Sequence, residues 1–177
     1  MDIQMMQEAL PQYISATLLT LKLALGGILL ALFIGLIMSF MSYFKVPVLK
    51  QIANAYTALS RNTPLLIQLF FLYYGLPRIG IRLEKETVGL IGLAFLGGGY
   101  MSEAFRGGIA SVPRIQIESG RAIGLTRWQL ARFIILPQGL ANSVPAIGAN
   151  VLFLLKETSI FSAIAIMDLT NVTRDLI

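Results

Sequence analysis

The 177-residue chain contains no cysteine and no histidine. Without cysteine it has no disulfide and no thiolate metal ligand, and without histidine it lacks the commonest catalytic base. Charged residues are also scarce, at 13% of the chain, whereas soluble domains average about 25%. The few acids are scattered, and no G-x-x-x-x-G-K-[ST] phosphate-binding loop is present. The sequence therefore predicts no enzyme, no metal site and no cofactor bound by this chain.

Apolar sequence is abundant instead, with 56% hydrophobic residues that gather into long uncharged runs. A helix needs about 20 apolar residues to cross the hydrocarbon core of a bilayer. The pattern predicts an all-α membrane protein in which residues 1–177 form one transmembrane domain. Residues 1–12 carry two acids and lack the basic start of a signal peptide, so the first apolar run is expected to remain as a helix. Four spans are expected, at about 17–43, 62–79, 86–106 and 137–156.

Basic residues gather in alternate loops between these spans. Residues 45–61 hold three basic side chains and no acid, and residues 106–132 hold five arginines against one acid. Because cytoplasmic loops carry an excess of Lys and Arg, both loops are assigned to the cytoplasm and the N-terminus to the outside. These loops also explain the net charge of +5, so nucleic acid is not expected as a partner.

The second basic loop reads as a helical hairpin within residues 110–137. Pro113 suits the first turn of a helix, where a missing N–H costs nothing. Gly124 favours the left-handed end of that helix. Thr126 and Gln129 have the spacing of a capping box for a second helix. That helix continues toward Pro137, where a break or the start of the next element is expected.

The spacing of residues in this hairpin resembles a known motif. Glu118, Ser119 and Gly120 are followed at fixed intervals by Gly124 and by an Ile-x-Leu-Pro ending at 134–137. This order is similar to the EAA motif in permeases of binding-protein-dependent ATP-binding-cassette (ABC) importers, with Ser and Gly in place of two alanines. Three further stretches resemble the polar amino acid branch of that family, namely 61–70, 100–109 and 156–159.

The resemblance implies the bundle of a type I ABC importer permease in a bacterial inner membrane. It implies that the hairpin docks on a cytoplasmic ATPase dimer, which binds ATP and Mg²⁺. Two further partners are implied: a second permease chain, identical or homologous, and an external substrate-binding protein. The family also has a fifth span, whereas the apolar stretch 160–167 is too short to cross. The residues implied to contact the ATPase are Glu118, Ser119, Gly120, Gly124 and Leu125.

Polar side chains within spans are costly and mark transport pathways. Glu157, near the outer end of the fourth span, fits the ammonium of an amino acid, and the hydroxyls of Thr158 and Ser159 fit its carboxylate. Asparagines in spans also serve as interhelical hydrogen-bond donors, and Glu103 has Arg106 as a partner three residues away. The candidates for the substrate pathway are Gln68, Glu103, Asn142, Asn150, Glu157, Thr158 and Ser159.

Three alternatives to an amino acid importer stay open. A channel or secondary transporter needs no ATPase, but it gives the hairpin no role, and no inverted repeat is visible. A membrane-embedded enzyme needs clustered catalytic groups, which the chain lacks. A permease for methionine, phosphonate or another solute shares the motif. The sequence does not name the amino acid, and it does not distinguish a homodimer from a heterodimer.

Overall fold

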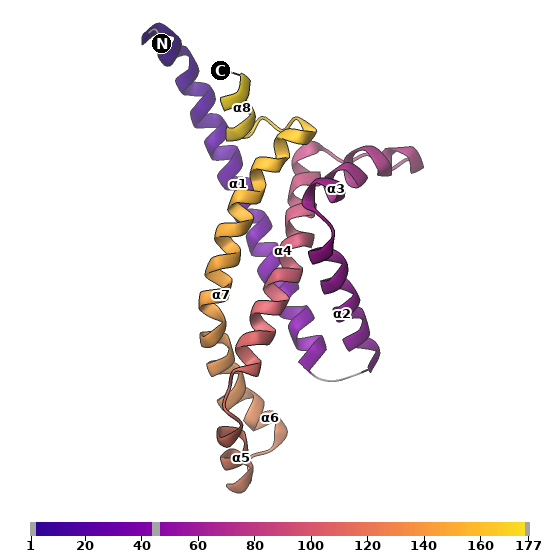
Figure 1. Ribbon diagram of the computed structural model, residues 1–177, viewed down its shortest axis with the longest axis vertical. Coiled ribbons are helices and arrows are strands. Elements are labelled where there is room, and N and C mark those ends of the chain that lie inside the picture. Colours follow the sequence, from indigo (N-terminus) through magenta and orange to yellow (C-terminus); the bar gives the residue numbers. More distant parts are fainter. Residues whose placement is uncertain (1–2, 44–46, 176–177) are drawn as a thin grey trace.

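The computed structural model describes residues 3–43 and 47–175, which are almost all helical and include no strand. Figure 1 shows an elongated bundle in which α1 (Ile3–Tyr43), α4 (Lys85–Ala110) and α7 (Leu136–Glu157) run along the long axis. The predicted all-α membrane fold is confirmed, and three of the four predicted spans fall within long apolar helical stretches. These stretches are Leu10–Tyr43, Lys85–Ala110 and Arg127–Ile164.

Glycines bring α1 and α4 into close contact. Gly27 lies against the side chain of Leu93, and a Cβ at Gly35 would come within 2.8 Å of the backbone nitrogen of Ser102. Lipid tails are as apolar as the helices, so close backbone approach and van der Waals packing hold such helices together. The core is accordingly centred on α4, whose fully buried side chains include Val88, Leu93 and Met101.

Within the predicted second span, 62–79, the chain is helical from Leu65 to Ile79, but this short apolar stretch is not one regular α-helix. Its residues are divided among α3 (Leu65–Phe70), the π-helical turn η1 (Phe71–Gly75) and the 3₁₀ turn η2 (Leu76–Ile79). Pro64 causes the first break, because proline has no N–H to donate and disfavours helical backbone in the residue before it. After α3 the chain leaves the bundle sideways (Figure 1).

A further helix, α2 (Pro47–Asn62), precedes this break and packs beside α4 (Figure 1). The charge pattern assigns most of its length to a loop. Its buried face consists of Ala53, Thr57 and Ser60, which lie at helical spacing. These side chains are small or polar, and the apolar side chains of α2 at helical spacing, Val48, Ile52 and Leu59, lie on an exposed side instead.

The hairpin continues into α7 without interruption. From α6 (Arg127–Gln129) the chain passes through the π-helical segment η3 (Leu130–Ile135) into α7. Pro137 therefore lies in the first turn of α7, the second of the two outcomes expected there. Its missing N–H accounts for the change of helix type, because π-helical turns form where the regular hydrogen-bond ladder is interrupted.

The last elements turn back toward α1. A 3₁₀ helix, η4 (Thr158–Ile164), ends at Ala165 with φ of 54°, and α8 (Leu169–Asp175) then packs on α1. The N–H of Leu169 donates to the Thr20 hydroxyl over 3.0 Å. The short apolar stretch 160–167 forms this turn, and both chain ends lie at the same end of the bundle (Figure 1).

Candidate functional site

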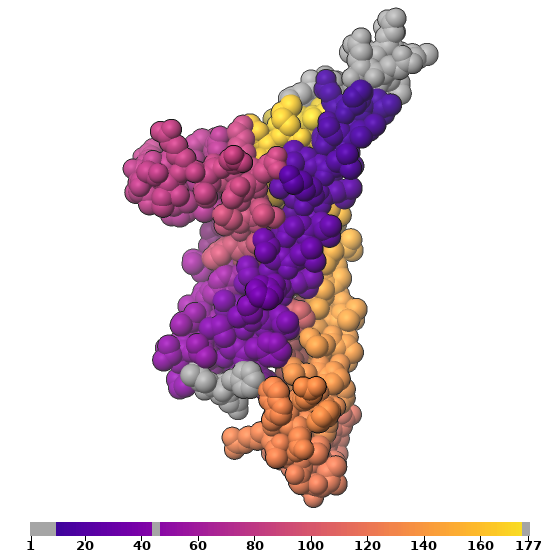
Figure 2. Space-filling model, turned by 180° about the vertical axis from the view of Figure 1, so that it is seen from behind, coloured from indigo at the N-terminus to yellow at the C-terminus, as the bar shows by residue number. Residues whose placement is uncertain are grey.

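The hairpin forms the end of the molecule opposite α8 (Figure 1), and Figure 2 shows it projecting at that end in the space-filling view. Its first helix, α5 (Arg114–Ala122), starts after Pro113 and stops at Gly124, whose φ is 83°. The N–H of Leu125 donates to the Gly120 carbonyl at 3.0 Å, and that of Gly124 to Arg121 at 2.9 Å. These two bonds define a Schellman motif, which satisfies the carbonyls at a helix end.

Capping and packing hold the second limb of the hairpin in place. The predicted capping box is present, with the Thr126 N–H donating to Gln129 Oε1 at 2.8 Å and the Gln129 N–H to Thr126 Oγ1 at 3.3 Å. Gly120 is buried between the limbs, where a Cβ would lie 2.5 Å from Leu130 and 2.8 Å from Ile134. The small residue at Gly120 therefore serves the internal packing of the hairpin.

The outward face of α5 carries the exposed members of the predicted ATPase contact. Glu118 and Ser119 are exposed, and Ser119 stands between Ile115 and Ile123, which are 66% and 78% exposed. Isoleucines this exposed at helical spacing make an apolar strip on the tip of the protein. A groove of about 390 Å³ runs beside the strip, against the second limb of the hairpin. An exposed apolar strip beside a groove is typical of a surface that binds another protein.

A polar cluster lies within the bundle, at the break between α2 and α3. The Glu103 carboxylate accepts a hydrogen bond from Arg106 at 2.6 Å and lies 3.7 Å from Arg61. The Arg61 guanidinium also stands 5.2 Å above the Tyr100 ring, where the ring attracts a cation. Asn150 of α7 donates to the Tyr100 carbonyl at 3.1 Å. Three helices thus contribute charged or amide groups to one place.

Gln68 closes the break beside this cluster. Its side-chain amide is buried and donates to the Ser60 carbonyl at 3.2 Å and to the Thr63 carbonyl at 2.9 Å. Both carbonyls lack helical partners because the chain is interrupted at Pro64. Gln68, predicted as a pathway residue, therefore uses its side-chain N–H groups on the backbone.

The other predicted residues lie elsewhere. Glu157 is half-buried at the end of α7, and the hydroxyls of Thr158 and Ser159 donate to the carbonyls of Leu155 and Lys156 at 2.7 and 2.8 Å. In this state neither hydroxyl has a proton left for a substrate carboxylate. Asn142 donates to the Ser111 hydroxyl at 2.8 Å, which ties α7 to the base of the hairpin.

The structure therefore unites two of the predicted pathway residues, Glu103 and Asn150, around two groups that the sequence analysis did not propose, Arg61 and Tyr100. Both residues fall in stretches that resemble the polar amino acid permeases, and this resemblance was the sequence feature that could have marked them as site residues. Their convergence depends on the packing of α2, which the charge pattern had assigned to a loop.

The match with a protein family agrees with this architecture. Residues 27–174 match the family described as the inner membrane component of binding-protein-dependent transport systems. The chain belongs to this family, and it is a multi-pass permease component. The resemblance drawn from the Glu118 to Pro137 spacing is thereby confirmed.

Individual relatives agree with the family match. A probable amino-acid permease of Bacillus subtilis is 37% identical over 171 residues, which covers 95% of this chain and 76% of the relative. A probable glutamine ABC transporter permease of the same organism is 39% identical over 154 residues, with 87% and 71% covered.

Two solved structures share the fold. A crystal structure of an amino acid ABC transporter with histidines superposes with a TM-score of 0.93 at 33% identity, over 99% of this chain and 82% of that one. Inward-facing conformations of a methionine ABC transporter give a TM-score of 0.77 at 20% identity, over 97% and 81% of the two chains. The latter is similar in fold alone.

Proposed function

We propose that this chain is the membrane-spanning permease subunit of an ATP-driven amino acid importer. The observation that carries the proposal is the exposed helical hairpin at one end of a permease bundle, together with relatives named as amino acid permeases. A separate ATPase, with its ATP and Mg²⁺, supplies the energy, and an external binding protein delivers the substrate. A second permease chain completes the pathway.

The hairpin is the proposed contact with the ATPase, through Glu118, Ser119 and the isoleucines beside them. It is joined to the bundle on both sides, since α4 leads into it and η3 continues into α7. The limbs are locked by the Schellman motif and the capping box, so a push on the tip moves the ends of α4 and α7 as one body. Such a motion alternates access to the two sides of the membrane.

The polar cluster at the α2–α3 break is the proposed substrate contact. Its chemistry suits an amino acid, because Glu103 complements an ammonium and Arg61 complements a carboxylate. Glu103 is only about one-third exposed, with its side chain at 31%. Partial removal from water strengthens a charged contact. Glu157, at the C-terminal end of α7, stays a second candidate for the ammonium.

The proposed orientation of the chain in the membrane follows from the basic residues of its loops. The hairpin has four arginines, all within residues 114–132, and therefore faces the cytoplasm. The N-terminus then lies on the outer side of a bacterial inner membrane. A cysteine introduced at Ser111 is expected to react with a membrane-impermeant reagent only from the cytoplasmic side, and one at Gln4 only from outside. The chain has no native cysteine, so no background labelling interferes.

The decisive experiment is uptake in proteoliposomes that hold the permease, the ATPase and the binding protein. We expect ATP-dependent accumulation of an amino acid and none when any one partner is omitted. Uptake without ATP or ATPase would instead identify a channel or secondary transporter. Uptake of a solute other than an amino acid would keep the ATP-driven importer and reject the substrate class.

A further inference from the structure

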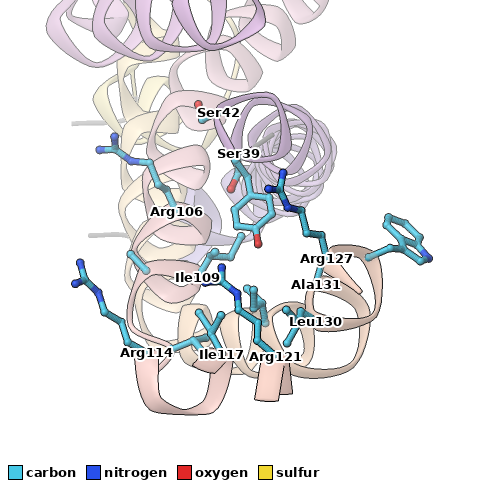
Figure 3. Close-up of a pocket in the computed structure, with 15 residues that line it drawn as sticks. Ser39, Ser42, Arg106, Ile109, Arg114, Ile117, Arg121, Arg127, Leu130 and Ala131 are labelled. Carbon is cyan, nitrogen blue, oxygen red and sulfur yellow. The ribbon is translucent and has the colours of Figure 1, made fainter. Parts of the chain in front are cut away.

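A second cavity, of about 890 Å³, opens between the end of α1, the lower part of α4 and the hairpin. Figure 3 shows it from the side, with Ser39 of α1 above and Leu130 and Ala131 of the hairpin below. It lies on the side of the hairpin that faces α1, whereas the groove beside Ser119 lies against the other side of α5. The proposed ATPase contact therefore does not use it.

Arginines dominate the charge of this cavity. Four line it, Arg106, Arg114, Arg121 and Arg127, and none of its lining residues in the described part of the chain is acidic. Arg106 is bonded to Glu103, but the other three form no ion pair with a described residue. Figure 3 shows Arg121 and Arg127 extending toward the end of α1, while Arg106 and Arg114 point to the side. Unpaired guanidinium groups around a hollow favour an anion.

A buried hydroxyl lines the same cavity. Ser39 is 2% exposed, and its Oγ has no hydrogen-bond partner among the described residues. This oxygen has almost no solvent-accessible surface, so it contributes no donor to a ligand in the cavity. The rest of the wall is largely apolar, with Ile109, Ile117 and Ile135 among its members. The cavity thus combines cationic groups with apolar walls.

We propose that this cavity binds the head group of an anionic phospholipid from the membrane leaflet on the hairpin side. The phosphate accepts hydrogen bonds from the guanidinium groups of Arg121 and Arg127, and the glycerol and upper acyl chains lie on the isoleucines. The location supports a lipid over a soluble anion, because the cavity opens where the apolar helices α1 and α4 end. Basic side chains at this depth attract anionic lipids. Trp128, 61% exposed on the same cavity, suits the membrane interface.

Trp128 also provides the assay, because it is the only tryptophan in the chain. The full chain is reconstituted in phosphatidylcholine vesicles that contain either brominated phosphatidylglycerol or the same fraction of brominated phosphatidylcholine. Bromine quenches tryptophan fluorescence at short range, so the two titrations give the relative affinity of the two lipids at the cavity. We expect wild type to prefer phosphatidylglycerol. Arg121→Gln should reduce the preference about fivefold, as expected for one arginine near an anionic surface.

Two further variants distinguish binding of the lipid in the cavity from non-specific attraction by the positive charge of the hairpin. Arg132→Gln removes the same charge from the same hairpin outside the cavity lining and should change the preference less than about twofold. Arg127→Gln removes a charge from the cavity wall and should lower the preference about as much as Arg121→Gln. Circular dichroism and elution profiles verify that each variant keeps its fold.

Four results would overturn the proposal. Equal quenching by both lipids in wild type would exclude selection, and equal losses in Arg121→Gln and Arg132→Gln would indicate diffuse attraction. Reversal of the quenching by inorganic phosphate would assign the cavity to a soluble anion. Release of the lipid on addition of the ATPase would assign it to the protein interface. None of these results depends on which substrate is transported.

Discussion

Replacing one of two adjacent glycines at the end of α4 should separate the packing of the bundle from the properties of the helix itself. Gly108 faces α7, where an added Cβ would meet the Ser143 hydroxyl and the Gly139 carbonyl and would lie 2.8 Å from the Ser143 nitrogen. Gly107 points away, and an added Cβ would meet no described atom within 4 Å. Alanine at either position adds the same methyl group. At Gly108 the methyl group would collide with α7, and at Gly107 it would enter open space.

The expected cost follows from these contacts. Carbon atoms pack at about 3.5–4.0 Å, so Gly108→Ala must push α4 and α7 apart by roughly 1 Å at the base of the hairpin. Two of the three obstructing atoms belong to backbone, which cannot rotate away. Overpacking of this kind costs about 1–3 kcal/mol. Gly107→Ala should instead gain up to about 1 kcal/mol, because alanine favours a helix over glycine.

Thermal unfolding in a mild detergent, followed by near-ultraviolet circular dichroism, measures the difference. Gly108→Ala should melt below wild type and Gly107→Ala at or above it. ATPase stimulation in proteoliposomes should fall in Gly108→Ala alone, because α4 and α7 carry the hairpin. Equal melting temperatures for the two variants would refute the close contact of α4 with α7 on which the reasoning rests.

Three further predictions concern the hairpin and the two candidate acids. Gly124→Val should weaken stimulation of the ATPase, because a branched side chain at φ of 83° costs about 1–2 kcal/mol; normal stimulation would exclude a role for this turn. Glu103→Gln should abolish most uptake in proteoliposomes while costing under about 1 kcal/mol of stability, since its ion pairs are partly exposed; unchanged uptake would remove the cluster from the pathway. Glu157→Gln should lower uptake without altering assembly, measured by co-purification with the ATPase, and wild-type uptake would leave Glu103 as the sole acid candidate.

Features that depend only on neighbouring residues could be predicted before the fold was known. Apolar runs located α1, α4 and α7, because burial in lipid requires an unbroken apolar length. Pro113, Gly124 and the Thr126–Gln129 pair located both limbs of the hairpin, because helix ends are decided within one turn. The spacing that begins at Glu118 indicated the family for the same reason.

How distant segments meet is seen only in the folded chain. In the cluster of Arg61, Tyr100, Glu103 and Asn150, the contacts between helices join residues 39 to 50 positions apart, and they depend on how α2 and α7 pack on α4. The inward role of Gly120 depends likewise on the second limb of the hairpin. Local signals such as hydropathy and capping do not specify which helix faces which. Contact between helices depends on the fit of their surfaces, and here small side chains and glycines set that fit.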